Sequence, residues 1–240
     1  MNMLSRRSLI TAGLGLVAGC STTKTYAGPE GAEGPGDPGG TNPGSILGPD
    51  GVSGLPLTEV TSIAMVGDSI TEGSADELEA AFADEGIDDV VIDGESSRRI
   101  KISNSSSDGP GMSGVNAVKA LLDSGADPTV WVIALGTNDV GSFGTPQECA
   151  DLIEEITTLL PPPAHLIWVN VYRPLELRQT KVFNEVLESV IEARGAAVVA
   201  DWYAIATDPE HDVLRDDEIH PNDSGQVAFA ELVVQALQRL

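Results

Sequence analysis

The sequence predicts an α/β protein built around a parallel sheet. From residue 59 onward, short runs rich in β-branched residues alternate with helical patterns, which is typical of this class. Groups of reactive residue types directly follow the predicted strands, where open α/β sheets bind their ligands. The chain has 240 residues, of which 41% are hydrophobic and 21% charged. This composition is too apolar for general disorder, and the length allows one domain or at most two small ones.

The predicted strands and helices alternate along the folded part. Strands rich in Val, Ile and Ala are expected at residues 61–66, 89–92, 129–135, 166–171 and 196–200. Helical patterns lie between them, and a last amphipathic helix follows, at residues 75–84, 114–124, 146–160, 177–194 and 223–240. Right-handed crossovers would then bring the residues that follow each strand to one edge of the sheet.

The start of the chain resembles a bacterial export signal. Arg6 and Arg7 precede an apolar run of about 10 residues, which is too short to span a bilayer. The arginine pair resembles a twin-arginine signal, and the segment 17–20, Val-Ala-Gly-Cys, resembles a lipoprotein box. The resemblance implies removal of residues 1–19, lipidation of Cys20, and anchoring at the outer face of a bacterial cell membrane. The alternative is an unprocessed or ordinarily secreted chain with an inert cysteine.

A compositional change follows the export signal. Residues 20–57 are rich in Gly and Pro and lack apolar periodicity, which predicts a disordered tether. Its root-mean-square reach as a random coil is on the order of 30 Å. There is no strict Gly-X-Y period, which argues against a collagen-like segment. The folded domain is therefore predicted to span residues 58–240.

Charge and cysteine content exclude several functions. With 13 Lys+Arg against 37 Asp+Glu, the formal net charge is −24, so the chain lacks the basic footprint that nucleic acids or anionic membrane surfaces require. Membrane contact is expected through the N-terminal lipid only. Cys20 and Cys149 cannot form a disulfide framework, and Cys149 is predicted to be a buried apolar side chain. We expect a monomer.

Three motifs lie at the predicted carboxyl edge of the sheet. Gly-Asp-Ser-Ile-Thr-Glu-Gly at 67–73 ends the first strand, Gly-Thr-Asn-Asp at 136–139 ends the third, and Asp-Glu-Ile-His-Pro at 217–221 precedes the last helix. Together they resemble the SGNH/GDSL hydrolase family, over about residues 60–240. The resemblance implies a three-layer α/β/α sandwich with a five-stranded parallel sheet, flavodoxin-like, and a serine hydrolase that needs no cofactor or metal.

These motifs contain the residue types of a catalytic triad. A serine hydroxyl becomes nucleophilic when a base accepts its proton, and His220 is the candidate base for Ser69. Asp217 lies three residues before His220, so both can sit on one turn with the carboxylate holding the imidazole in the useful tautomer. Asp216 is an adjacent alternative.

The resemblance also implies an oxyanion hole. Its donors would be the backbone N–H of Ser69, a backbone N–H after the second strand, and the side chain of Asn138. The second position holds Ser97 where the family usually has glycine, and a positive φ there would strain a serine. Gly94 is the alternative donor.

Other residues near the motifs are candidates for substrate binding. Arg98, Tyr172 and Arg173 follow predicted strands and were selected for this role, whereas Trp202 is expected to pack in the core. His165 is expected to be structural.

The surroundings of His211 in sequence are the one place that suggests a metal site. Its neighbours are acidic but lack tight ligand spacing, so no metal is expected: Asp208, Glu210, Asp212 and Asp216.

The sequence thus predicts an exported serine esterase or acylhydrolase. It would cleave short O-acyl esters such as acetyl through an acyl-enzyme, on envelope or extracellular glycans. Two alternatives remain open: an O-acyltransferase that uses the same triad, and a non-catalytic glycan-binding module on the same fold.

Overall fold

The computed structural model describes residues 55–103, 105–106 and 109–240. The predicted signal peptide, Cys20 and the tether up to residue 54 lie outside the described residues. The described chain begins shortly before the predicted start of the domain at residue 58, and Leu55 and Leu57 pack against the hydrophobic core. No helix in these described ranges has both the length and the apolar character needed to cross a bilayer.

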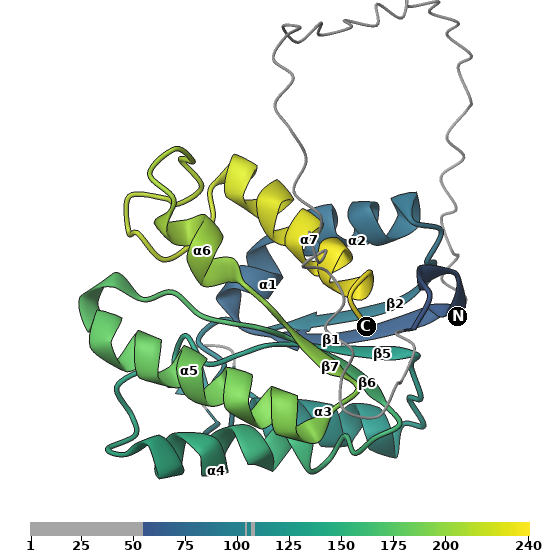
Figure 1. Cartoon of the computed structure of the whole chain (residues 1–240), viewed down its shortest axis with the longest axis horizontal. Coiled ribbons are helices and arrows are strands. Elements are labelled where there is room, and N and C mark those ends of the chain that lie inside the picture. The colour runs from purple at the N-terminus through teal and green to yellow at the C-terminus, as the bar shows by residue number, and fades with distance from the viewer. Residues whose placement is uncertain (1–54, 104, 107–108) are drawn as a thin grey trace, which may run out of the picture. The chain divides into compact units, whose positions relative to one another are not determined.

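Five parallel strands form the central sheet, in the order β2-β1-β5-β6-β7 (Figure 1). This confirms the predicted sheet, with strand ends shifted by one or two residues: β1 Ser62–Gly67, β2 Asp89–Gly94, β5 Val130–Ala134, β6 His165–Val169 and β7 Ala197–Ala200. A separate antiparallel pair of two-residue strands was not predicted: β3 Ser105–Ser106 and β4 Gly109–Pro110.

The strand order has one reversal, and it lies at β1. The chain leaves β1 toward β2 on one side and returns to β5 on the other, so β1 has both as neighbours. Ligands of open α/β sheets bind at the carboxyl ends of the strands beside such a reversal. The first two motifs, which follow β1 and β5, therefore lie where the topology favours a site.

Helices cover both faces of the sheet, as Figure 1 shows. One layer comprises α1 Ser69–Gly73, α2 Ala75–Asp84, α6 Trp202–Thr207 and α7 Asp223–Leu237. The opposite layer comprises α3 Gly114–Asp123, α4 Pro146–Thr157 and α5 Leu177–Arg194. Short 3-10 turns occupy Leu57–Glu59 and Pro174–Glu176. The short helices α1 and α6 were not predicted, and α4 and α7 each end three residues earlier than expected.

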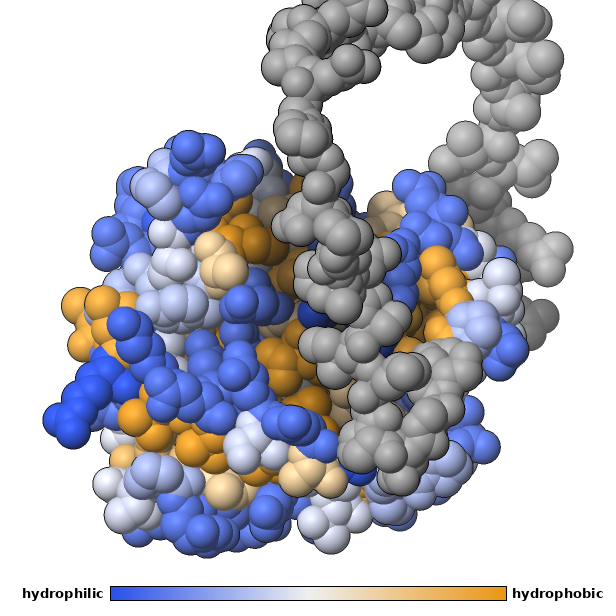
Figure 2. Space-filling view, viewed as in Figure 1, coloured by the Kyte–Doolittle hydropathy of each residue, from blue (hydrophilic) through white to orange (hydrophobic). Residues whose placement is uncertain are grey.

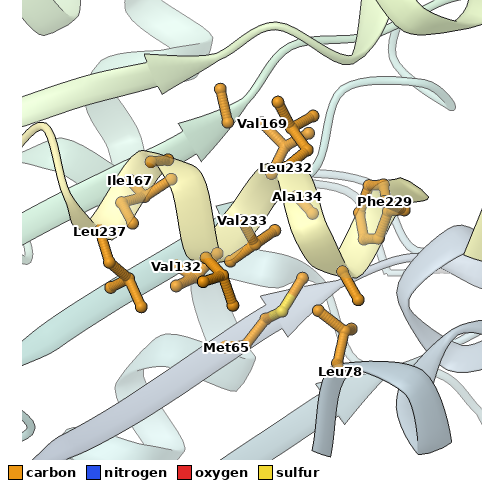
Figure 3. Packing of buried hydrophobic residues seen from close by; sticks show 14 of the residues in the cluster. Met65, Leu78, Val132, Ala134, Ile167, Val169, Phe229, Leu232, Val233 and Leu237 are labelled. Atoms are coloured by element: carbon orange, nitrogen blue, oxygen red, sulfur yellow. The ribbon is translucent and has the colours of Figure 1, made fainter. Parts of the chain in front are cut away.

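Alternation along the strands explains the two layers. Successive side chains of a strand point to opposite faces, so a strand buried on both sides serves two cores. Met65 and Val132 pack with Phe229 and Val233 of α7 in one core (Figure 3). Their strand neighbours Val66 and Ile133, with Trp168, pack beside Phe183 of α5 in the other core. The three-layer α/β/α prediction is thereby confirmed.

Candidate active site

Ser69 is presented at a sharp turn from β1 into α1. Asp68 caps this helix, because its Oδ1 accepts a hydrogen bond from the Ile70 N–H at 3.0 Å. A Cβ on Gly67 would lie 1.9 Å from Thr71 Oγ1, so only glycine fits where the strand bends into the helix. Ser69 is the first helical residue, and its N–H therefore has no intrahelical partner.

Ser69, His220 and Asp217 form a hydrogen-bonded chain. Ser69 Oγ lies 2.9 Å from His220 Nε2, and His220 Nδ1 lies 2.8 Å from Asp217 Oδ2. The structure therefore brings together the three residues selected as a triad, although Ser69 and His220 are 151 positions apart. Asp216, the sequence alternative to Asp217, makes no such contact with His220.

The turn that carries Asp217 and His220 is braced by its own backbone. Asp217 Oδ1 accepts the N–H groups of Ile219 and His220, both at 2.9 Å. The hydrogen bond from the His220 N–H is the largest cause that lowers the pKa of the Asp217 carboxyl, to about 2. Asp217 is thus a carboxylate at neutral pH and accepts the Nδ1 proton. His220 Nε2 is left as the acceptor for the Ser69 hydroxyl.

Asn138 lies beside this nucleophile turn. The loop after β5 turns at Gly136, whose φ of 128° and close approach to Phe183 exclude a side chain. Asn138 Nδ2 then lies 3.1 Å from the carbonyl oxygen of Arg98 and 3.4 Å from Asp68 Oδ2. The amide predicted to serve the oxyanion hole is therefore held between the loops that follow β1, β2 and β5.

The second backbone donor lies in the segment 94–97 after β2. Ser97 has a φ of 60°, the left-handed conformation that the sequence identified as a source of strain for serine. Gly94 has a different constraint, since a Cβ there would lie 2.4 Å from the Glu72 backbone N. Glu95 donates its N–H to Gly67, so the N–H of Gly94, one residue earlier, points away from β1. Within the described chain the Ser97 N–H has no backbone acceptor among the loop and turn hydrogen bonds, and the choice of Ser97 stays a prediction.

Arg98 does not have the exposed position that a substrate-binding residue needs. Its side chain is 2% exposed, and its N–H groups donate to protein acceptors on all sides. It was predicted to meet an anionic group of the substrate because it follows the predicted oxyanion donor Ser97, with a surface arginine pair as the alternative. The structure corrects this prediction, because the guanidinium points into the protein and is buried there.

The other two substrate-binding candidates remain accessible. Tyr172 is half-buried and packs edge-to-face against Tyr203, with ring centroids 5.9 Å apart. Arg173 is also half-buried and donates from Nη1 to the carbonyl oxygen of Thr137 at 3.0 Å. Arg173 thus ties the loop after β6 to the residue that precedes Asn138.

A small pocket borders Ser69 and His220, and a larger cleft is lined by Asp216 and Glu218, which flank Asp217 in sequence. A pocket of about 30 Å³ borders Ser69 and His220, with further walls from Ile70, Gly73, Ser74, Arg215, Pro221 and Gln226. A larger, open cleft of about 480 Å³ is lined mainly by polar residues: Tyr172, Ala206, His211, Asp212, Val213, Leu214, Arg215, Asp216 and Glu218. Figure 2 shows that the surface over α6 and the loop before α7 is largely hydrophilic, in keeping with this lining.

Two buried carboxyl groups support the loops rather than the chemistry. Burial is the largest cause that raises the pKa of Asp68 and of Asp139 to about 6 in each case. Asp139 Oδ2 accepts the Ile100 N–H at 3.0 Å, and Arg99 Nε lies 3.4 Å from Asp139 Oδ1. Neither carboxyl contacts His220 by a hydrogen bond.

The remaining side chains singled out in the sequence lie away from the triad. His211 Nδ1 pairs with Asp208 at 2.9 Å, and in the part of the chain that the structure covers no three His, Cys, Asp or Glu residues form a metal-binding group. Cys149 and Trp202 are buried, as predicted, and Trp202 packs edge-to-face on Phe229. His165 begins β6.

Comparison with known proteins identifies the family. Residues 65–228 match the GDSL-like Lipase/Acylhydrolase family, which is more than half of the chain. The chain belongs to this family. It is accordingly a hydrolase of the GDSL/SGNH esterase type, and the resemblance inferred from its three motifs is confirmed. No curated protein matches the sequence.

Solved structures of this GDSL-type fold match the chain at low identity. The catalytic domain of Streptococcus pneumoniae peptidoglycan O-acetyltransferase A is 19% identical, with a TM-score of 0.57 over 75% of this chain and 94% of that one. A psychrotrophic esterase from Pseudoalteromonas sp. is 19% identical, with a TM-score of 0.55 over 75% of this chain and 97% of that one. A family 3 carbohydrate esterase of Clostridium thermocellum is 18% identical, with a TM-score of 0.52 over 73% of this chain and 94% of that one. These similarities show the shared fold.

Proposed function

We propose that this GDSL-family hydrolase is a serine esterase that removes short O-acyl groups, such as acetyl, through an acyl-enzyme. The observation that carries the proposal is the chain of short contacts from Ser69 Oγ through His220 to Asp217. Each group has the state its role requires, because a charged Asp217 keeps the proton on His220 Nδ1 and frees Nε2 to accept.

The reaction follows from these positions. His220 Nε2 accepts the hydroxyl proton as Ser69 Oγ bonds to the ester carbonyl carbon. The carbonyl oxygen becomes an oxyanion and is stabilised by the Ser69 N–H, the Asn138 amide and an N–H from the segment 94–97. The carbonyl re-forms as the C–O bond to the alcohol breaks, and the alcohol oxygen takes the proton from His220. Water then attacks the acyl-enzyme by the same steps and releases the acid.

The small pocket beside Ser69 supports a short acyl group. Its volume of about 30 Å³ is only about twice the 10–15 Å³ that a cavity needs to hold one water molecule, which favours a short acyl group over a long chain. Gln226 on α7 bounds it and donates from Nε2 to the Gly73 carbonyl oxygen at 2.5 Å, which links α7 to the end of α1. Longer acyl groups would have to displace this side chain.

The open cleft supports a polar alcohol partner. Its acidic and tyrosine lining suits a sugar with many hydroxyl groups better than an aliphatic chain. The export signal and lipoprotein box expected at residues 1–20 would bring the enzyme to acylated glycans outside the cell, and we propose these as substrates. His220 is 35% exposed, so a sugar hydroxyl could replace water in the second half-reaction. O-acyl transfer is therefore the second candidate function, and the likeness to a peptidoglycan O-acetyltransferase domain also favours it.

Steady-state hydrolysis of p-nitrophenyl acetate and butyrate by the full chain tests the proposal. We expect turnover of acetate well above that of butyrate, and its loss in Ser69→Ala. Ser124→Ala, at an exposed serine at the end of α3, should retain wild-type rates. Adding an O-acetylated polysaccharide and a free acceptor sugar separates release of acetate from transfer to the sugar. Turnover that persists in Ser69→Ala, or a folded wild type without turnover of either ester or polysaccharide, would reject the assignment.

A further inference from the structure

Arg98 is the centre of a buried hydrogen-bond network at the carboxyl edge of the sheet. Its Nε donates to the Met112 carbonyl oxygen at 3.1 Å. Its Nη1 donates to the carbonyl oxygens of Gly67 and Asp93 at 3.0 and 2.5 Å. Its Nη2 donates to Asp93 Oδ1 and Glu95 Oε2 at 2.8 and 2.9 Å. A guanidinium has five N–H groups, so every donor is in use.

The acceptors of Arg98 adjoin the candidate oxyanion donors. Gly67 lies two residues before Ser69. Asp93 and Glu95 lie on either side of Gly94, and Ser97 immediately precedes Arg98. The guanidinium therefore fixes the end of β1 against the segment that carries both candidates for the second donor, whichever of the two serves.

The main chain of Arg98 reaches the third donor as well. Its carbonyl oxygen accepts a hydrogen bond from Asn138 Nδ2 at 3.1 Å. One amide hydrogen of Asn138 is thereby directed, and this sets the orientation of the amide plane. Arg98 is thus in contact with the loops after β1, β2 and β5, which supply all the donors of the proposed hole.

We infer that Arg98 is the positioning residue of the oxyanion hole: it holds the Ser69, 94–97 and Asn138 donors in register without touching the substrate. The inference rests on the proposed esterase function. Catalysis by preorganised donors depends on their being fixed before charge develops, and a misplacement of about 1 Å can cost about a hundredfold in rate. A buried arginine with every N–H bonded supplies such rigidity.

Lysine cannot reproduce this network. An ammonium group keeps the charge that balances the partly exposed carboxylates of Asp93 and Glu95, but it offers three donors from one point. The planar fork of arginine is needed to reach Met112, Gly67 and Asp93 at the same time. Arg98→Lys therefore loosens the donors while leaving the net charge unchanged.

The chain contains a matched control, Arg194 at the end of α5. Its guanidinium also makes five hydrogen bonds to protein oxygens, all of them main-chain carbonyls. These belong to Leu160, Ala164, Gly195 and Ala196, at the amino ends of β6 and β7. Arg194→Lys breaks a network of the same size at the edge of the sheet opposite the triad.

The experiment measures p-nitrophenyl acetate hydrolysis and covalent labelling of Ser69 by a fluorophosphonate in full-length wild type, Arg98→Lys and Arg194→Lys. For Arg98→Lys we expect kcat and the labelling rate to fall roughly 10- to 100-fold, with KM and the shape of the pH profile nearly unchanged. Arg194→Lys should lower the unfolding temperature but retain kcat. A milder variant, Glu95→Gln, keeps an acceptor for Arg98, and its kcat should fall in the same direction by a smaller factor.

The outcomes separate the two proposals. Wild type that neither hydrolyses acetate nor labels at Ser69 rejects the esterase function and this inference with it. Wild type that reacts, beside folded Arg98→Lys and Glu95→Gln that react equally fast, rejects only the role of Arg98. Equal losses of kcat in Arg98→Lys and Arg194→Lys would show a general effect of stability and would also overturn the inference. Should Arg98→Lys fail to fold, the kcat of Glu95→Gln decides.

Discussion

Two Asp-X-X-His turns lie nine residues apart in this chain, and only one of them forms a triad. Asp208 and His211 pair through Oδ2 and Nδ1 at 2.9 Å, and Asp217 and His220 pair through the same atoms at 2.8 Å. Both pairs are well exposed, with 63% of the His211 side chain and 35% of the His220 side chain accessible. The local chemistry of the two turns is thus nearly the same.

The turns differ in their backbones. Glu218 follows Asp217 with a φ of 56°, and the Asp217 carboxylate then accepts the N–H groups of both Ile219 and His220. In the other turn Pro209 occupies this position, and proline cannot adopt a positive φ. Asp208 Oδ1 accepts the Glu210 N–H alone.

The turns differ also in what lies beyond the imidazole. His220 Nε2 faces Ser69. The two ends of its turn are held together, because Arg215 donates its N–H to the His220 carbonyl oxygen at 2.8 Å and its Nε to that of Pro221. A three-residue spacing therefore builds an aspartate–histidine pair almost by itself. Only the Asp217–His220 pair is placed by the rest of the fold against a serine, and this placement is what the proposed triad requires.

Substituting the two aspartates should separate pair formation from catalysis. In Asp217→Asn the amide no longer holds the useful imidazole tautomer, and we expect kcat for acetate to fall roughly ten-thousandfold. Asp208→Asn alters the same kind of pair and should retain wild-type kcat. Both carboxylates are exposed enough that neither variant should unfold the chain, which circular dichroism would check. A large loss of kcat in Asp208→Asn would show that the two turns act together and would break the comparison.

Replacing the residue that follows the aspartate tests the role of the positive φ. Glu218→Pro gives the catalytic turn the proline of the other turn. Because proline cannot adopt a φ of 56° and has no N–H to donate to Arg215, the turn must rearrange, and we expect kcat to fall by about a hundredfold. Glu218→Gly, which tolerates the conformation, should retain kcat and serves as the matched control. Equal kcat in the two variants would refute the importance of this backbone conformation.

The elements that position the triad could be predicted from sequence because their signals are local. The helix at 177–194 was predicted with its observed bounds, and the strand β1 was predicted to within one residue at each end. The five residues of α1 were too few to show a period, so Ser69 was not expected to begin a helix. The residues of the proposed triad were predicted from two of the three motifs, at 67–73 and 217–221, and the spacing within each motif is short.

The network around Arg98 could not be predicted in this way. Its acceptors Gly67 and Met112 lie 31 and 14 residues from it in sequence, so no local spacing records the contacts. A charged residue after a strand suggested a ligand contact, whereas burial of the guanidinium decides against it. The sequence indicated that a positive φ at Ser97 would strain the serine, but it could not predict that the φ is positive. Serine can adopt either sign of φ, and a positive φ only at an energetic cost.

Titration should distinguish the carboxylates of the two exposed turns from the buried carboxyl of Asp139. Backbone and histidine hydrogen bonds lower the pKa values of Asp208 and Asp217, so their contributions to stability are present above the unfolded pKa of about 4 and are lost as pH falls below it. Burial raises the pKa of Asp139 to about 6, so the native state keeps a proton that the unfolded chain releases. The free energy of unfolding then decreases as pH rises from 4 to 6.

In Asp139→Asn this decrease should be smaller by about 1–2 kcal/mol, measured by urea denaturation at pH 4, 5, 6 and 7. Asp208→Asn should show the opposite sign, retaining more of its neutral-pH stability than wild type as pH falls below 4. A parallel change in both variants would mean that burial does not separate these carboxyl groups.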